Sequence, residues 1–319
     1  MKTLLETYTN GNATVEIYTD GTRTLDYQGE LNLDVPLQVD LKITNHCDLS
    51  EYCQWCHEGS NKQGQHGDLD KALSVVAGMP KGSELAIGGG NPLDHPGLTA
   101  FLIKARSLGL IPNMTVNELH LKRYKSQLEE LINRNLIFGL GISYSGKQKA
   151  LIKHFVDLNP NTVIHVIAGI QDVNCLKELK GICDKVLVLG YKKFGKGEDF
   201  YYDNSVKAIN TEIDDKIDRW KMLLPKYFGK FTLSFDNRAI SQLKVKRYFT
   251  TEGWDLFYQG DEGTISFYID AVKKKFAMNS TALVRHPFNH LGIDWMFNEI
   301  KKERAFFKGA IKKLSKAEV

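Results

Sequence analysis

Apolar and polar positions change their spacing along the chain. Residues 13–27, "ATVEIYTDGTRTLDY", alternate apolar and polar side chains around Asp20 and Gly21, which predicts a β-hairpin. From Leu37 the pattern becomes short β-rich apolar runs separated by helical stretches, and it keeps this form as far as Gly195. The chain therefore begins with a small β appendage and continues as an alternating β/α core.

Six strands and five helices are expected in this core. We expect strands at 37–44, 84–89, 112–117, 137–143, 162–169 and 185–191, with helices near 68–79, 97–108, 124–135, 147–157 and 173–182. Asp68 and Asp172 are candidate helix N-caps. Because parallel neighbours need a long crossover connection, this order predicts a parallel sheet, either an open or closed α/β barrel or a doubly wound sheet.

The pattern loosens after Gly195. A long polar helix is expected at about 205–226, then a strand at 230–237 and a hairpin at 264–280. We therefore predict an N-terminal hairpin extension at 1–36, a core at 37–200 and a C-terminal cap at 201–319 that packs on the same core.

Charge and hydropathy restrict the partners only mildly. The 319 residues carry 42 basic and 38 acidic side chains, a formal charge of +4. Acids are interleaved through the region around the basic stretch 244–249, so a nucleic-acid partner is possible but not indicated. No segment approaches the roughly 18 apolar residues of a membrane span, and the N-terminus lacks the features of a signal peptide. We expect a cytoplasmic protein without a membrane partner.

Three of the five cysteines, Cys47, Cys53 and Cys56, lie close together in the loop after the first core strand. In a reducing compartment such a cluster indicates metal binding or catalysis rather than disulfides. Zinc would need a fourth ligand, which His57 or His66 could supply. A four-iron cluster would use the three thiolates and leave one iron open. The spacing alone does not separate these two sites.

The second core strand ends in "AIGGGNP", residues 86–92. Consecutive glycines at the end of a strand allow the polar groups of a ligand to approach the backbone closely. A tight strand-to-helix turn is the simpler explanation when this segment is taken alone. Its position beside the cysteine loop favours a binding role.

Together these two segments resemble the motifs of the radical SAM superfamily. Its usual C-x3-C-x2-C motif is here C-x5-C-x2-C, with Trp55 in the aromatic position, and "GGNP" at 89–92 stands where the family has a Gly-Gly-Glu-Pro-like motif. The resemblance covers about residues 37–200. It implies an α/β fold, a partial (β/α)6 TIM-like barrel with an N-terminal β-hairpin and a C-terminal α+β cap.

The resemblance also implies the cofactors and the reaction. Cys47, Cys53 and Cys56 would hold a [4Fe–4S] cluster that binds S-adenosyl-L-methionine (SAM) and cleaves it reductively to methionine and a 5′-deoxyadenosyl radical. This radical would abstract hydrogen from an unidentified substrate: a nucleotide or modified base, a peptide or a small metabolite. The electron would come from a donor such as flavodoxin or ferredoxin.

Further contacts follow from the strand order of the family. The implied SAM-contacting residues are Trp55, Gly89, Gly90, Asn91, Asn117, Ser143, Ser145, Gly169 and Tyr191. Asp172 either lies near adenine or serves only as a helix cap. Lys192 and Asp270 are candidate substrate residues, whereas Cys175 and Cys183 are expected to be ordinary buried or surface thiols. Two departures from the family pattern stand out, the longer gap before Cys53 and an asparagine, Asn91, where Glu is usual.

Overall fold

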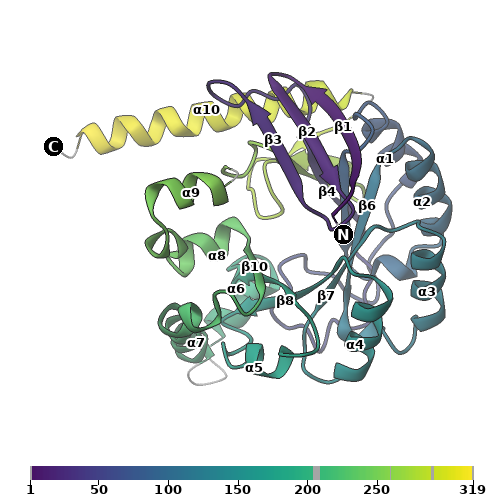
Figure 1. Ribbon diagram of the computed structural model, residues 1–319, viewed down its shortest axis with the longest axis vertical. Helices are drawn as coiled ribbons and strands as arrows, with labels where there is room; N and C mark the ends of the chain where they lie inside the picture. Colours follow the sequence, from purple (N-terminus) through teal and green to yellow (C-terminus); the bar gives the residue numbers. More distant parts are fainter. Residues whose placement is uncertain (1, 204–208, 259, 289–290, 318–319) are drawn as a thin grey trace.

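The protein is described by a computed structural model that covers residues 2–203, 209–258, 260–288 and 291–317, with side chains described as far as residue 307. Its main element is a ten-stranded, mostly parallel sheet with helices packed along it (Figure 1). The strand order is β10-β9-β8-β7-β6-β5-β4-β11-β12-β13. The fold is therefore a mixed α/β fold built on one large sheet.

The six strands expected in the core are adjacent in this sheet. They are β4 (Gln38–Thr44), β5 (Glu84–Gly89), β6 (Ile111–Asn117), β7 (Gly139–Ser143), β8 (Thr162–Ala168) and β9 (Lys185–Gly190), and each pairs in parallel with the next. The crossovers contain α1 (Leu69–Val76), α2 (Leu98–Ser107), α3 (Lys125–Asn133), α4 (Lys149–Leu158) and α5 (Cys175–Leu179). The predicted alternation of strands and helices is confirmed.

The two faces of the sheet differ in polarity. Val39, Leu41 and Ile43 of β4 are buried in the hydrophobic core with the apolar sides of the helices. Because side chains alternate along a strand, the opposite face carries polar residues such as Asp40 and Lys42. Parallel strands also place all their carboxyl ends at one edge, so the loops that follow them gather there.

The C-terminal segment extends the sheet on both sides. β10 (Thr232–Phe235) pairs in parallel with β9, and β11 (Ser266–Asp270) pairs in parallel with β4. β12 (Lys275–Ala277) and β13 (His286–Pro287) follow as antiparallel strands. The expected strand and hairpin are thus present, and both belong to the main sheet.

The N-terminal segment forms a separate antiparallel sheet of β1 (Leu4–Asn10), β2 (Ala13–Tyr18) and β3 (Arg23–Tyr27). The hairpin expected at 13–27 is β2 and β3. The first strand was not expected, because most of its side chains are exposed and "LLETYTN" has no apolar alternation.

Of the two predicted helix N-caps, one is confirmed and one is wrong. Asp68 caps α1 by accepting the N–H of Lys71. Asp172 does not cap α5, whose N-cap is Asn174; its carboxylate accepts the Asn174 N–H at 2.9 Å and pairs with Arg219 at 2.5 Å. The polar helix expected at 205–226 is α7 (Ile209–Leu223), and residues 204–208 lie outside the described residues.

Four further helices complete the fold. They are α6 (Lys196–Tyr202), α8 (Asn237–Gln242), α9 (Thr251–Phe257) and α10 (Ile293–Ala317). In the view of Figure 1 the α10 helix crosses at one end of the three-stranded sheet and projects beyond the rest of the molecule. In the part of the chain that is described, every helix is too short or too polar to cross a membrane.

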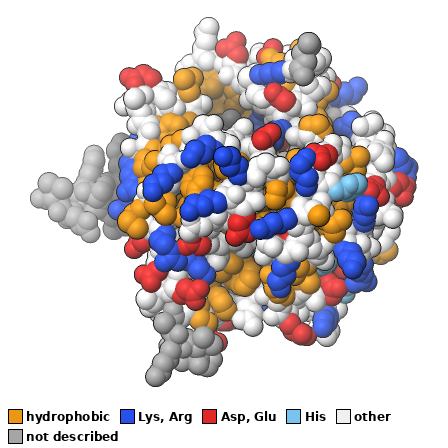
Figure 2. Space-filling view, turned by 60° about the horizontal axis from the view of Figure 1, so that its bottom comes forward, with side chains coloured by type: hydrophobic (Ala, Val, Ile, Leu, Met, Phe, Trp, Pro, Cys, Tyr) orange, Lys and Arg blue, Asp and Glu red, His pale blue; other side chains and the backbone are white. Residues whose placement is uncertain are grey.

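Charged side chains are mixed on the surface. Figure 2 shows Lys and Arg side chains interspersed with hydrophobic and acidic ones on the face that comes forward. Within the basic stretch 244–249, the Nζ of Lys246 lies 5.7 Å from the centre of the Trp254 ring and Arg247 donates to the Lys221 carbonyl. These internal contacts agree with a solvated surface segment.

Candidate functional site

The three clustered cysteines lie in one loop at the carboxyl end of β4. Backbone hydrogen bonds close the base of this loop, from Asn45 N–H to the Gln65 carbonyl at 2.8 Å and from Cys47 N–H to the Asn61 carbonyl at 2.9 Å. Cys47, Cys53 and Cys56 are free thiols and half-buried. The cysteines are therefore held on a loop whose ends the protein itself fixes.

The thiols are close enough to affect one another. Burial raises the pKa of Cys47 to about 11 and that of Cys53 to about 12. The neighbouring thiols add to both shifts, since a second negative charge nearby disfavours ionisation. The three thiols thus lie on one loop, near enough for their charges to interact.

The three cysteine sulfurs do not all lie within 4.8 Å of one another. Zinc at about 2.3 Å from each thiolate would bring the sulfurs to about 3.8 Å from one another. Among the described residues, the one group of three potential ligands whose atoms all lie within 4.8 Å is Cys47, Asp48 and His120. In a four-iron cluster each thiolate binds a different iron, so the sulfurs stand farther apart than in a zinc site.

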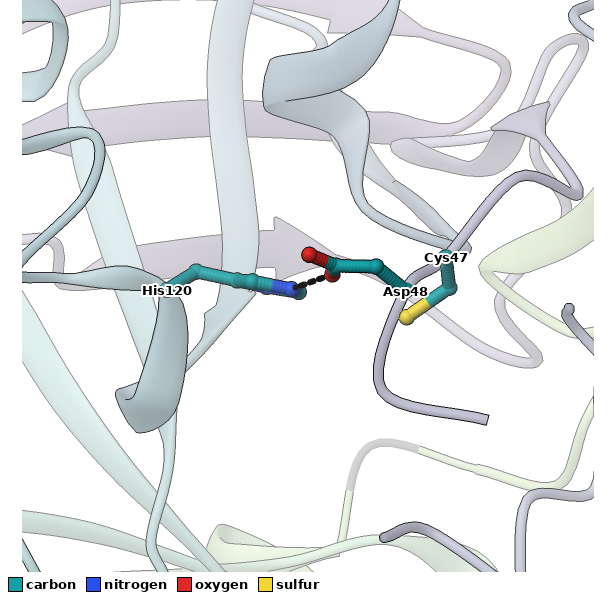
Figure 3. Close-up of side chains that lie close together, drawn as sticks. All are labelled: Cys47, Asp48 and His120. Carbon is teal, nitrogen blue, oxygen red and sulfur yellow. Dashed lines mark hydrogen bonds and ion pairs between the residues drawn. The ribbon is translucent and has the colours of Figure 1, made fainter. Parts of the chain in front are cut away.

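The group formed by Cys47, Asp48 and His120 is an anchor for the loop (Figure 3). His120 follows β6, and its Nε2 lies 2.8 Å from Asp48 Oδ1, while Arg123 donates to Asp48 Oδ2 at 2.8 Å. Burial raises the pKa of Asp48, but the hydrogen bond and charge of His120 and the charge of Arg123 outweigh it and lower the pKa overall. Both carboxylate oxygens are thus engaged, which ties the cysteine loop to the end of β6.

The glycines after β5 pack against the start of the cysteine loop. A Cβ on Gly90 would lie 2.0 Å from the His46 carbonyl oxygen, and one on Gly89, whose φ is +116°, would lie 2.4 Å from that of Thr44. The N–H groups of Gly90 and Asn91 donate to the Thr44 and His46 carbonyls at 2.8 and 2.7 Å. The absence of side chains at 89 and 90 therefore lets two backbone segments approach, whereas a Cβ on Gly88 would meet no atom within 4 Å.

Asn91 is almost completely buried. Its Oδ1 accepts the N–H of Leu93 at 3.4 Å and caps a short 3₁₀ helix. Its Nδ2 has no hydrogen-bond partner among the described residues. The Asn91 side chain therefore places a buried amide donor without an acceptor beside the cysteine loop.

Asn117 and Ser143 end the adjacent strands β6 and β7 and are paired in register. The Asn117 side chain accepts the Leu119 N–H at 3.0 Å, and its Nδ2 approaches Cys53 Sγ at 3.8 Å. Asn117 is thus in contact with the cysteine loop, and Ser143 lies beside it on the neighbouring strand.

Glu118 positions the loop after β7. This carboxylate is completely buried and accepts the backbone N–H groups of Ser145, Gly146 and Gln148. Ser145 is therefore held through its backbone, and its Oγ has no partner among the described residues. The sequence around Glu118 does not indicate this role, because the three donor residues lie 27 to 30 positions later, beyond α3 and β7.

Changing Glu118 to Ala is expected to lower the free energy of unfolding by about 1–3 kcal/mol, because three buried N–H groups lose their acceptor. Glu118→Gln keeps one carbonyl oxygen and is expected to lose less. Urea denaturation of the two variants measures the difference. Equal stability of Glu118→Ala and the wild type would contradict this role.

Three other expected cofactor residues have partners within the protein. Trp55 packs edge-on between Tyr52 and Phe200, each with ring centres 6.0 Å away. Tyr191 is buried and donates to the Gly197 carbonyl at 2.6 Å, and a Cβ on Gly169 would meet Ile213 of α7 at 3.0 Å. Packing thus accounts for these residues, and a contact to cofactor stays a prediction.

A buried polar network joins the cysteine loop to β11. Lys42 Nζ lies 2.7 Å from Glu58 Oε2 and 3.9 Å from Asp270 Oδ2. The Tyr268 hydroxyl donates to Glu58, and Asp270 Oδ1 accepts the N–H groups of Val272 and Lys273. Asp270 is only 1% exposed and its contacts are those of a turn and an ion pair.

The two histidines near the cysteines, His57 and His66, form hydrogen bonds to hydroxyl groups. His57 Nε2 lies 3.2 Å from Ser280 Oγ, and His66 Nδ1 lies 2.9 Å from Thr44 Oγ1. Lys192 Nζ also reaches Ser280 Oγ, at 3.2 Å. Cys175 and Cys183 are buried, as expected for ordinary thiols away from the loop.

Comparison with known proteins identifies a shared fold. No family model matches the sequence, and no curated relative does. SuiB of Streptococcus suis bound to the precursor peptide SuiA aligns with a TM-score of 0.56 at 12% identity, over 87% of this chain and 83% of that chain. SuiB bound to S-adenosylmethionine aligns with a TM-score of 0.52 at 13% identity, over 77% of this chain and 60% of that chain. A further structure of SuiB aligns with a TM-score of 0.51 at 13% identity, over 86% of this chain and 81% of that chain.

At these identities the similarity is one of fold. The chain therefore shares its fold with SuiB, a protein whose structures are bound to S-adenosylmethionine and to a precursor peptide.

Proposed function

We propose that this protein is a radical SAM enzyme that holds one [4Fe–4S] cluster on Cys47, Cys53 and Cys56. The observation that carries the proposal is the placement of three free, half-buried thiols on one loop at the carboxyl end of a parallel strand, in a fold shared with SuiB. When bound, the cluster supplies the electron that cleaves SAM to methionine and a 5′-deoxyadenosyl radical. That radical would abstract hydrogen from the substrate.

The architecture supports this assignment. We infer that β4 to β9 form the partial (β/α)6 barrel of the superfamily, with residues 1–36 as an extension and 201–319 as the cap. Each loop that carries a proposed cofactor residue then lies at the same end of the sheet as the cysteines.

The protein residues bind and orient the cofactor. The carbonyls of Gly89 and Gly90 and the free amide donor of Asn91 lie beside the cysteine loop. Asn91 replaces the glutamate of the family, so it would donate to a carboxylate oxygen of SAM instead of accepting from its amine. Asn117, Ser143 and Ser145 line the next strand ends and would contact the remainder of SAM.

The substrate and the electron donor are proposed only as classes. SuiB, which shares the fold, binds a precursor peptide, and this supports a peptide as one candidate substrate beside a nucleotide or a small metabolite. A flavodoxin or ferredoxin would supply the electron.

Anaerobic purification tests the proposal. The protein is expected to be brown and to contain about four irons per chain. Incubation with dithionite and SAM should release 5′-deoxyadenosine, measured by liquid chromatography. A colourless protein with one tightly held zinc would refute the proposal in favour of a Cys3His zinc protein, and an intact cluster that forms no 5′-deoxyadenosine would refute the proposed chemistry.

A further inference from the structure

A cavity near the cysteine loop lies between the two outer edges of the main sheet. Its volume is about 790 Å³. One wall comes from the loop after β9 and from α8, which follows the edge strand β10. The other wall comes from residues 261–283, around the hairpin at the opposite edge, and from α10.

The cavity is next to the cysteine loop. A Cβ on Gly195, in the loop after β9, would lie 2.7 Å from the His57 carbonyl oxygen, and one on Gly197 would lie 3.1 Å from that of Trp55. The same loop contributes Lys192 and Phe194 to the wall of the cavity. The loop that contributes to the cavity wall therefore also packs against the cysteine loop.

Lys192 and Glu262 both line this cavity but do not form an ion pair. Lys192 Nζ is held by Ser280 Oγ at 3.2 Å, and Glu262 Oε2 accepts from Asn279 Nδ2. In the described part of the chain, neither side chain lies within 4.0 Å of an oppositely charged group. Two consecutive residues, Asn279 and Ser280, thus hold opposite charges that belong to opposite walls of the cavity.

The charge of Lys192 still acts on Glu262 across the cavity. Burial raises the pKa of Glu262, and the charge of Lys192 is the main effect that opposes this shift. Lys192 likewise lowers the raised pKa values of Asp40 and Asp236, so its charge is balanced at a distance and not by contact. Half-buried charges without a contacting partner are costly, and a ligand with complementary charges would remove that cost.

Further hydrogen bonds hold Ser280, the residue that contacts Lys192, in place. Arg285 donates to the Ser280 carbonyl at 2.6 Å, and Ser280 Oγ also lies 3.2 Å from His57 Nε2, next to Cys56. Apolar side chains, Phe194, Met278 and Leu283, complete the wall. A ligand with one anionic end, one cationic end and an apolar body matches this lining.

We propose that this cavity binds a zwitterionic ligand of the amino-acid type, with its carboxylate at Lys192 and its ammonium group at Glu262. Arg238, which lines the same cavity, provides a second cation near the carboxylate end. If the proposed function holds, this ligand is the substrate or the part of it that fixes its position, and only that identification rests on the proposed function.

The test uses zwitterions of increasing length: glycine, β-alanine, γ-aminobutyrate and ε-aminocaproate. Binding to the anaerobically purified protein with SAM is measured by isothermal titration calorimetry. At least one member is expected to bind with a dissociation constant of about 1 mM or below. Its N-acetyl derivative and its methyl ester, which each lack one charge, should bind about 10-fold or more weakly.

Variants of the protein test the two charges separately. Lys192→Gln and Glu262→Gln should each weaken binding about 10-fold or more. The double variant Lys192→Glu with Glu262→Lys should bind the zwitterion again in the reversed orientation. Lys193→Gln and Glu198→Gln, which change charges at the same cavity, are the matched controls and should bind normally. Thermal unfolding midpoints verify that each variant is folded.

Several results would overturn the proposal. These are no binding by any member of the series, equal binding by the singly charged derivatives, or unchanged binding by both single variants. Calorimetry needs no turnover, so a protein that binds the zwitterion but forms no 5′-deoxyadenosine would refute the proposed function while leaving the cavity assignment intact.

Discussion

Replacing Cys47, Cys53 or Cys56 by Ala is expected to remove the iron and to abolish SAM cleavage. A four-iron cluster with one open iron has only three protein ligands, so the loss of one thiolate leaves two irons without a protein ligand. Iron analysis, the visible absorption spectrum and 5′-deoxyadenosine formation measure the effect. The fold itself should persist, since backbone hydrogen bonds close the loop without metal.

The chain offers matched controls for this experiment. Cys175→Ala and Cys183→Ala remove buried thiols outside the loop and should keep full iron content. They are expected to lose about 1 kcal/mol of stability through the small cavity that each leaves. If a variant at 47, 53 or 56 kept four irons and full activity, that residue would not be a cluster ligand.

Gly90→Ala is expected to have the next largest effect. The new methyl group would lie 2.0 Å from the His46 carbonyl oxygen, so either the segment after β5 or the start of the cysteine loop must move. Both contacting groups are backbone, which cannot turn aside as a side chain does. We expect stability to fall by about 1–3 kcal/mol or more, together with most of the bound iron.

Gly88→Ala is the matched control two residues earlier in the same segment. A Cβ there would meet no atom within 4 Å, so the change should leave the thermal midpoint and the iron content close to those of the wild type. If Gly90→Ala bound iron as well as Gly88→Ala did, the close approach of the two segments would not be needed for the site.

The core strands could be predicted because their pattern is local. β8 (Thr162–Ala168) is a short run rich in apolar and β-branched residues, and such a run is visible in the sequence without knowing the neighbours. β10 has no buried residue, and its place in the sheet depends on pairing with β9. The parallel pairing of β11 with β4 joins distant parts of the sequence, and no local pattern indicates it.

The site could be predicted in part for the same reason. The spacing of the cysteines and the run of glycines are local signals, and the structure places both at the same end of the sheet. The contact of Asp48 with His120 spans 72 positions and that of Glu118 with Ser145 spans 27, so only the fold reveals them. The same holds for Lys192 and Glu262, whose separation depends on Ser280 and Asn279.

The network between the cysteine loop and the C-terminal strands has a consequence for biosynthesis. Tyr268 reaches Glu58 across 210 positions, and Ser280 reaches His57 across 223. On the ribosome the cysteines emerge long before these partners exist, and contacts of such high sequence separation form late in folding. We therefore expect the proposed cluster to be inserted after translation, once Tyr268 and Ser280 contact the cysteine loop.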